Sequence, residues 1–280
     1  MTNVIQRNNV EVLGTGSEVL MLAHGFGCNQ QMWRFLIPEL AQRFQLVLFD
    51  YVGANTSDLS AFCSKKYAEL DGYAQDIIDI CEALDLNKVT LVGHSVSGMI
   101  SLIAAQKIPE RIANLVMVCP SPCFLNDGDD YQGGFEHDDL QELLDLMDKN
   151  YIDWANYLAP LVTGTEAGAL TSELSESFCS TNPITAKTFA KATFFSDHRS
   201  LLPRNQHPTL LIQSDQDSLA AVTVGQYMAE NMPHSQLQVV PARGHCLHMS
   251  HPDTVAAVIH EFLPAKSNGA THELRAACHT

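Results

Sequence analysis

Positive charge is scarce in this sequence of 280 residues. Lysine and arginine together number 16, against 32 aspartate and glutamate residues, and the formal net charge is −16 at pH 7. Such an excess of negative charge repels the phosphate backbone of nucleic acids and anionic membrane surfaces. We therefore expect neither nucleic acid nor a membrane as a partner.

Long apolar runs are also missing. No run approaches the roughly 18 residues that a membrane-spanning helix needs, and the first twenty residues lack the basic start and apolar segment of a secretory leader. The eight cysteines are scattered, and no Cys-x-x-Cys pair indicates a zinc or dithiol site. We expect a soluble, cytoplasmic protein with reduced thiols and no metal.

Short apolar runs alternate with helical patterns along the chain. Residues 18–24, 44–50 and 88–94 are such runs, and each precedes a turn signal and a helical pattern. This alternation is typical of parallel strands joined by crossover helices. Further buried strands are expected at 112–121, 207–215 and 236–242.

A long excursion separates two of these strands. Residues 124–202 contain helical segments without strand signals, and an insertion of that length needs structure of its own. We interpret it as a helical cap between two parts of one core domain. The expected division is core at 1–123, cap at 124–202, core at 203–264 and a flexible tail at 265–280.

Ser95 lies in the stretch GHSVSG, between a predicted strand and a predicted helix. The small residues Gly93, Ser97 and Gly98 surround it, as the sharp turn of a nucleophile elbow requires. The usual motif is Gly-x-Ser-x-Gly, and Ser97 stands in its fifth position here. A serine at such a place can also be only a helix cap, but the partner residues downstream favour a nucleophile.

A nucleophilic serine needs a histidine to remove its proton and a carboxylate to orient that histidine. Asp217 and His245 follow two later predicted strands. Because the carboxyl ends of parallel strands meet at one sheet edge, we expect both near Ser95. Asp217 is preferred as the acid over Asp215, which can cap or shape the turn. Two further histidines are interpreted as packing or capping groups: His248 and His251.

Two backbone amides are candidates for stabilising an oxyanion. The loop HGFG after the strand at 18–24 can turn its amides inward, and the residue after an elbow serine supplies a second donor. These donors are the amides of Phe26 and Val96. Nucleotide binding is not indicated, because no Gly-x-Gly-x-x-Gly loop follows a strand and no Gly-Lys-Ser/Thr motif is present.

With these motifs the sequence resembles the RsbQ-type α/β-hydrolases, which include a bacterial stress-response regulator and, more distantly, the plant strigolactone and karrikin receptors. The resemblance extends over residues 3–263, and its blocks include HGFGCNQQMW, FDYVGANTSDL, VGHSVSGMI and ARGHCLHMSHP. It implies an α/β-hydrolase fold with a mostly parallel, eight-stranded sheet flanked by helices and a four-helix cap. It also implies Ser95, Asp217 and His245 as a catalytic triad.

The resemblance further implies an apolar pocket between cap and sheet. From the sequence alone, aromatic residues at helical spacing are more often ordinary core, and only the family pattern moves them to a ligand cavity. The implied pocket residues are Phe26, Phe124, Phe135, Leu143, Trp154, Leu158, Phe194 and Leu219.

The expected activity is hydrolysis of an ester or lactone bond in a small apolar molecule, in a signalling or stress-response role and without a cofactor. A second hypothesis is a ligand-sensing receptor or regulator with slow turnover, which acts through a protein partner such as a PAS-domain phosphatase. Cofactor-free haloperoxidases and carbon–carbon bond hydrolases share the same triad and stay open. Dehalogenases and epoxide hydrolases have aspartate at the elbow, so Ser95 argues against them.

Overall fold

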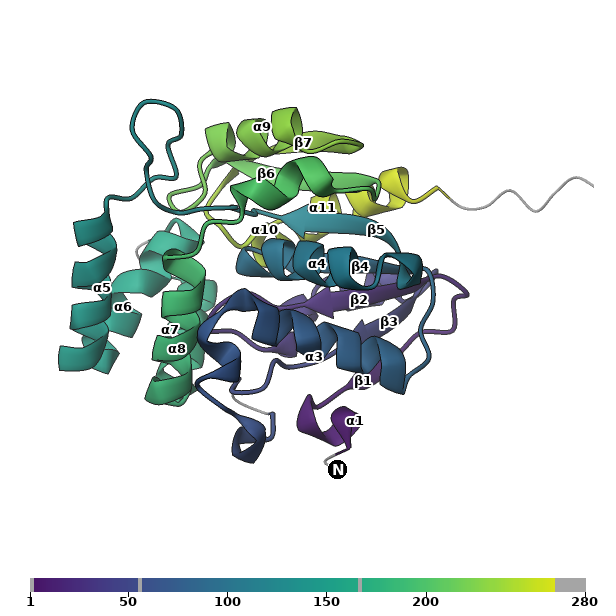
Figure 1. Ribbon diagram of the computed structural model, residues 1–280, viewed down its shortest axis with the longest axis horizontal. Coiled ribbons are helices and arrows are strands. Elements are labelled where there is room, and N and C mark those ends of the chain that lie inside the picture. Colours follow the sequence, from purple (N-terminus) through teal and green to yellow (C-terminus); the bar gives the residue numbers. More distant parts are fainter. Residues whose placement is uncertain (1–2, 55–56, 166–167, 265–280) are drawn as a thin grey trace, which may run out of the picture.

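Seven strands form one sheet in the computed structural model, which describes residues 3–54, 57–165 and 168–264. The sheet order is β1-β3-β2-β4-β5-β6-β7, and every neighbouring pair is parallel except β1 with β3 (Figure 1). The tail expected at 265–280 lies outside the described residues. The strands are β1 (Glu11–Leu13), β2 (Val19–Ala23), β3 (Gln45–Leu48), β4 (Val89–His94), β5 (Ile112–Val118), β6 (Thr209–Gln216) and β7 (Ser235–Arg243).

The expected eighth strand is not found among the described residues. Ahead of β1 the chain forms the short helix α1 (Val4–Arg7). Asn3 caps this helix, because its side-chain oxygen accepts a hydrogen bond of 3.0 Å from the Ile5 amide. The edge strand β1 was not predicted either, since all three of its residues are exposed and show no alternation of apolar and polar side chains.

Alternate side chains along the strands enter two separate apolar cores. In β2, Leu20 and Leu22 belong to one core, whereas Met21 and Ala23 belong to the other. Successive side chains of a strand point to opposite faces of a sheet. Both faces are therefore buried, which explains why these parallel strands appear as continuous apolar runs in the sequence.

Helices cover both faces of the sheet (Figure 1). Side chains of α3 (Leu70–Ala83), α4 (Val96–Lys107) and α9 (Val222–Asn231) pack into one core. The other core receives side chains of η1 (Gln30–Trp33), α2 (Ile37–Leu40), α10 (Leu247–Ser250) and α11 (Pro252–Phe262), as well as of the helices beside the sheet that are described next. The remaining 3₁₀ helices in the described residues are η2 (Leu59–Ala61), η3 (Lys66–Ala68), η4 (Pro109–Arg111) and η5 (Arg199–Arg204).

Four further helices lie together beside the sheet, on the left in Figure 1: α5 (His137–Lys149), α6 (Tyr151–Thr163), α7 (Ala169–Ser180) and α8 (Pro183–Phe194). Asn150 separates α5 from α6, and its side chain caps α6 by accepting from the Asp153 amide. Two hydroxyls hold these helices to core loops. Ser177 donates to the Gly27 carbonyl and Thr185 to the Gly53 carbonyl, each over 2.8 Å.

No helix in the described parts of the chain is both long enough and apolar enough to cross a bilayer.

Candidate active site

The candidate site lies where the strand order of the sheet reverses. From β2 the chain crosses to β3 on one side and then returns to β4 on the other side of β2. The loops that leave β2 and β4 diverge at such a switch point and leave a crevice, the usual ligand position in open α/β sheets. The register pairs Ala23 with Gly93 there, which brings the loop with Phe26 beside the turn with Ser95.

Ser95 occupies a strained turn between β4 and α4. Its φ of 56° and ψ of −125° are rare for an L residue, and a conformation of this kind costs about 1–3 kcal/mol. The Ser95 amide donates to the Val118 carbonyl over 2.8 Å, which ties the turn to β5. Gly93 has to be glycine, because a Cβ there would lie 2.3 Å from the Ser97 carbonyl oxygen. The small neighbours of Ser95 thus permit the sharp turn.

Ser95, His245 and Asp217 form one hydrogen-bonded chain. His245 Nε2 lies 2.7 Å from Ser95 Oγ, and His245 Nδ1 lies 2.7 Å from Asp217 Oδ2. All three residues are buried. The carboxylate accepts the proton on Nδ1, so the lone pair of Nε2 faces the serine hydroxyl. This is the tautomer that can remove the proton from Ser95.

Asp217 is kept ionised by its surroundings. Burial alone raises the pKa of this carboxyl, but the interaction with His245 and hydrogen bonds from backbone amides outweigh burial and lower the pKa below its ordinary value. The two amides belong to Leu219, at 2.8 Å, and Ala220, at 3.1 Å. Asp215 instead accepts the Ala242 amide over 2.9 Å. It therefore braces β6 against β7 and does not contact the histidine.

The neighbouring histidines have structural contacts. His94 Nε2 donates to the His245 carbonyl over 2.9 Å, which links the residue before Ser95 to the loop that carries His245. His248 is fully buried between the rings of Trp33 and His94, at centroid distances of 4.6 and 4.3 Å. His251 precedes α11 and contacts the Ser250 hydroxyl. The sequence did not single out His94, whose only signal is its place inside the elbow motif.

The two candidate oxyanion donors lie on either side of the crevice. Val96 follows Ser95 and is the first residue of α4, where helix amides lack an acceptor within the helix. Phe26 belongs to the loop after β2 and lines the same small cavity as Ser95. Within the described ranges, neither amide donates a hydrogen bond to another backbone group. Both are thus available to a ligand.

An inner chamber of about 30 Å³ adjoins Ser95 and His245. Five of the predicted pocket residues line it: Phe26, Phe124, Leu158, Phe194 and Leu219. Cys246, which the sequence placed beside the histidine, lines it too. The sequence did not indicate the remaining apolar and polar lining residues, because helix packing decides them: Cys28, His94, Val162, Leu174, Phe178 and Thr193.

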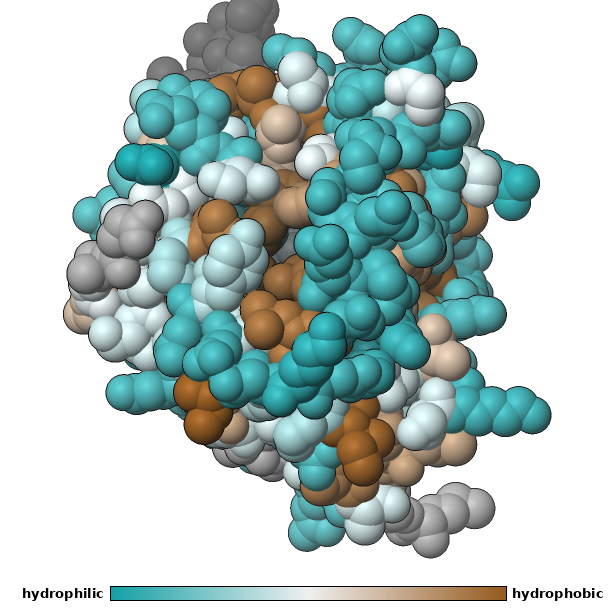
Figure 2. All heavy atoms as spheres, turned by 90° about the vertical axis from the view of Figure 1, so that its left-hand side faces the viewer, coloured by the Kyte–Doolittle hydropathy of each residue, from teal (hydrophilic) through white to brown (hydrophobic). Residues whose placement is uncertain are grey.

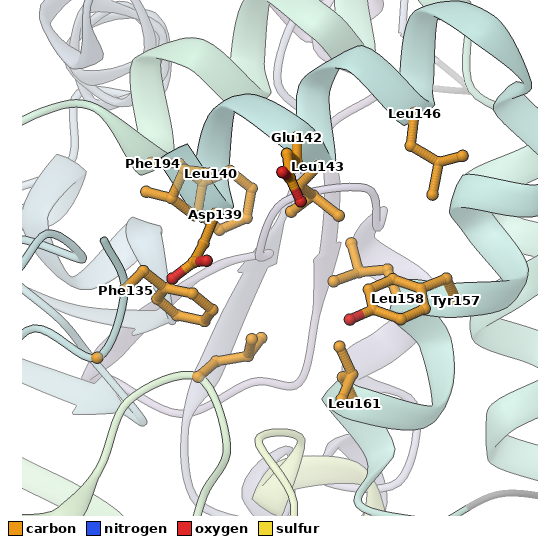
Figure 3. Close-up of a pocket in the computed structure, with 12 residues that line it drawn as sticks. Phe135, Asp139, Leu140, Glu142, Leu143, Leu146, Tyr157, Leu158, Leu161 and Phe194 are labelled. Carbon is orange, nitrogen blue, oxygen red and sulfur yellow. The ribbon is translucent and has the colours of Figure 1, made fainter. Parts of the chain in front are cut away.

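An outer chamber of about 560 Å³ lies between α5, α6 and the loop before α5 (Figure 3). The predicted residues Phe135 and Leu143 line it, as do three residues shared with the inner chamber: Leu158, Phe194 and Leu219. Figure 2 shows a hollow with hydrophobic side chains between hydrophilic ridges on the side of the molecule where α5 lies.

Trp154 lines neither chamber, although the resemblance placed it in the pocket. Its ring packs against Phe26 and Phe178, at centroid distances of 6.0 and 5.4 Å. Trp154 thereby packs against two side chains that line the inner chamber and does not line the chamber itself.

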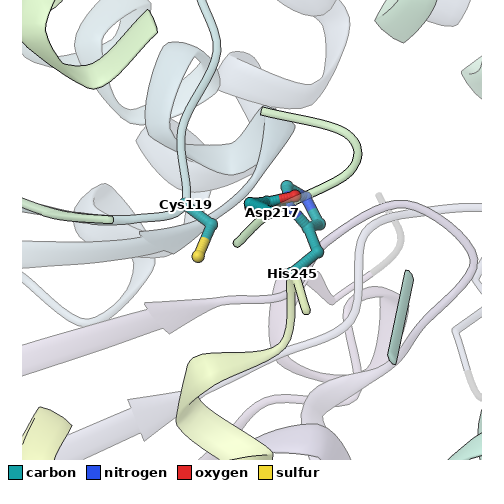
Figure 4. Close-up of side chains that lie close together, drawn as sticks. All are labelled: Cys119, Asp217 and His245. Atoms are coloured by element: carbon teal, nitrogen blue, oxygen red, sulfur yellow. Dashed lines mark hydrogen bonds and ion pairs between the residues drawn. The ribbon is translucent and has the colours of Figure 1, made fainter. Parts of the chain in front are cut away.

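Cys119 also lies close to Asp217 and His245 (Figure 4). Cys119, Asp217 and His245 each offer a ligand atom, and these atoms lie within 4.8 Å of one another. Burial raises the pKa of the Cys119 thiol well above its ordinary value, and metals bind the thiolate. The acid and the base are already bonded to each other. These donors fit a hydrogen-bonded pair beside a neutral thiol better than a metal site.

The α/β-hydrolase class is defined by three features that are present here. They are a strained serine elbow, a histidine–carboxylate pair after later strands, and a mostly parallel sheet with helices on both faces. The chain belongs to the alpha/beta hydrolase fold family, whose model matches residues 18–252. The expected fold class is therefore confirmed, with seven strands described.

Similar proteins include plant receptors and esterases. Karrikin insensitive 2 receptor CA of Petunia hybrida is 38% identical over 91% of this chain and 95% of its own. Strigolactone esterase D14 of Arabidopsis thaliana is 33% identical over 94% of this chain and 98% of its own. The solved structure of a hydrolase from Oleispira antarctica has a sequence identity of 55% and a TM-score of 0.91. The match covers 93% of this chain and 96% of the other. The resemblance to strigolactone and karrikin receptor hydrolases is thus confirmed.

Proposed function

We propose that this protein is a serine hydrolase that cleaves an ester or lactone bond in a small, mostly apolar molecule. The observation that carries the proposal is the hydrogen-bonded chain from Asp217 through His245 to Ser95, which ends at an apolar chamber. The similarity to a strigolactone esterase and to a hydrolase of known structure supports the same chemistry.

In the first half of the reaction, Ser95 Oγ attacks the carbonyl carbon of the substrate while His245 Nε2 takes the hydroxyl proton. The amides of Phe26 and Val96 stabilise the resulting oxyanion. Asp217 stabilises the imidazolium that forms. His245 then donates the proton to the leaving oxygen, so that the alcohol departs and the acyl group stays on Ser95.

In the second half, a water molecule attacks the acyl carbon and gives its proton to His245. The bond to Ser95 Oγ breaks, the serine recovers its proton from His245, and a carboxylic acid is released. With a lactone, the alcohol and the acid are two ends of one product. Every proton transfer uses His245, so this route needs no metal or organic cofactor.

We also propose that residues 124–202 act as a cap and that the substrate binds between the cap and the core formed by 1–123 and 203–264. The two chambers support this assignment, because α5, α6 and α8 supply part of their walls while Leu219 and the triad come from the core.

The test is hydrolysis of 4-nitrophenyl acetate by a Ser95→Ala variant. We expect turnover to fall to the background rate, and we expect the mass of the intact wild-type protein to rise by one acyl group during turnover. Ser101→Ala is the matched control, because Ser101 is a buried serine on α4 whose hydroxyl has no partner among the described residues. Unchanged turnover by the Ser95 variant would overturn the proposal.

A second candidate function is ligand sensing with slow turnover, in which a protein partner such as a PAS-domain phosphatase reads the bound state. The similarity to proteins named as karrikin receptors favours it. Thermal melting with lactone and ester ligands, followed by pull-down with the Ser95→Ala variant, tests this function. If no ligand shifts the melting temperature and none changes partner retention, the receptor function fails.

A further inference from the structure

The two chambers share one wall. Leu158 of α6, Phe194 of α8 and Leu219 after β6 line both the inner and the outer chamber. All three side chains are buried. A substrate that reaches Ser95 from the outer chamber therefore has to lie across this wall, with one part in each chamber.

The leaving alcohol has to lie on the outer side. During the reaction the acyl group stays covalently bound to Ser95 while the alcohol departs. An alcohol enclosed in the inner chamber could not leave past the acyl group that blocks its path. The acyl group consequently belongs in the inner chamber, and the alcohol part in the outer one.

The inner chamber is small. Its volume is about 30 Å³, whereas the outer chamber measures about 560 Å³. An acyl group that fits the inner chamber is therefore short compared with what the outer chamber can hold. The outer chamber, at about 560 Å³, leaves room for a much larger alcohol part.

One wall residue of the inner chamber carries an unused hydroxyl. Thr193 of α8 is buried, and its Oγ1 has no hydrogen-bond partner within the described parts of the chain. Threonines elsewhere on this helix are satisfied: Thr188 donates to the Ile184 carbonyl and Thr185 to Gly53. An unpaired buried hydroxyl is costly unless a ligand satisfies it.

We propose that the inner chamber selects a short acyl group that contains an oxygen atom, and that the Thr193 hydroxyl donates a hydrogen bond to this oxygen. The proposal rests on the proposed hydrolase function and adds the substrate class: esters of small alkoxy- or oxo-substituted acids with larger, mostly apolar alcohols. Because a threonine hydroxyl on a helix can adopt two rotamers, it can adjust to the bound group.

The test compares two esters of equal length. The 4-nitrophenyl esters of butyric and methoxyacetic acid differ by one ether oxygen in place of a methylene. The ratio of their kcat/KM values is divided by the ratio of their hydroxide hydrolysis rates, which removes the difference in intrinsic reactivity. We expect the corrected ratio to favour methoxyacetate in the wild-type protein and to fall about fivefold in Thr193→Val, which keeps the shape but lacks the hydroxyl.

Thr193→Ser should retain the preference, and Thr188→Val, on the same helix, is the matched control. Because the ratio is internal to each variant, partial loss of folded protein does not affect it. Equal corrected ratios in the wild-type protein and Thr193→Val overturn the role of Thr193. If the wild-type protein hydrolyses neither ester, the proposed function fails and this proposal fails with it.

A chain-length series tests the size of the inner chamber separately. We expect the wild-type protein to hydrolyse the butyrate ester at least tenfold more efficiently than the octanoate ester, and Leu219→Ala to narrow this difference. Equal or greater efficiency with octanoate in the wild-type protein overturns the placement of the acyl group.

Discussion

The hydroxyl of Ser97 donates a hydrogen bond of 2.5 Å to the main-chain carbonyl of His24. The hydroxyl of Tyr51 lies 2.9 Å from Ser97 Oγ and can donate to it, and both side chains are buried. His24 begins the loop that carries Phe26, a candidate oxyanion donor. Ser97 stands where glycine is usual in the elbow motif, and here it ties the elbow to the oxyanion loop.

Loss of this tie should slow catalysis without weakening substrate binding. We expect Ser97→Ala to lower kcat for 4-nitrophenyl acetate by about fivefold, with KM nearly unchanged, because one net hydrogen bond of about 1 kcal/mol positions the Phe26 amide. Tyr51→Phe should have a smaller effect of the same kind. In the double variant the two effects should not add. A change in KM alone would contradict this role.

The acid is predicted to be Asp217 and not its neighbour. Asparagine at 217 cannot accept the Nδ1 proton of His245 in the same way, so the imidazole no longer keeps the required tautomer. We expect Asp217→Asn to lower kcat by about 10³–10⁴-fold. Asp215→Asn is the matched control, since an amide oxygen can still accept the Ala242 amide, and it should retain most activity. Comparable losses in both variants would argue against this assignment.

Buried histidines predict a loss of stability in mild acid. Burial lowers the pKa of His24, lowers that of His94 to about 3, and holds that of His248 well below 6.5. Below pH 6.5 these histidines become protonated in the unfolded chain but stay neutral in the folded protein. The unfolded state then binds more protons, so a lower pH favours unfolding. Stability should therefore fall as the pH drops from 6.5 towards 3, by up to about 1.4 kcal/mol per pH unit for each histidine.

Urea unfolding between pH 7.5 and 5 measures this slope. His248→Phe should flatten it by about one histidine's contribution, because its ring has no hydrogen-bond partner among the described residues and can be replaced by an apolar ring. His137→Gln is the control, since the His137 side chain is exposed in the folded protein. An unchanged slope in His248→Phe would show that His248 does not carry the expected linkage.

The cysteines should differ in reactivity. Hydrogen bonds from the Lys66 and Lys65 amides lower the pKa of the exposed Cys63 thiol, whereas burial raises the pKa of Cys119 and Cys246 well above the ordinary value. Iodoacetamide at pH 7.5 should therefore modify Cys63 long before the two buried thiols. Peptide mass spectrometry measures the order, and hydrolytic activity should survive the first modification. Early labelling of Cys119 would indicate that the site opens to solvent.

The order of elements was largely accessible from the sequence, because each depends on a local pattern. The run at 88–94 forms β4 over Val89–His94, and the predicted helix after Ser95 coincides with α4. Residues that follow parallel strands meet at one sheet edge. The order of the strands along the chain was therefore enough to predict that Ser95, Asp217 and His245 lie close together. Local patterns did not indicate β1, whose exposed residues show no alternation, or the short helix α1.

The sequence by itself determined most of the strand and helix pattern, the elbow, and the expectation that Asp217 and His245 lie near Ser95, since these follow from short-range spacing and from the rule that strand ends converge. Only the tertiary structure decided the shape of the site. The packing of α6 and α8 against the sheet decides three features of the site. It sets whether Trp154 lines a chamber or supports it, which three side chains lie between the chambers, and whether the Thr193 hydroxyl has a hydrogen-bond partner. That packing joins residues far apart in the chain, and no local pattern records it.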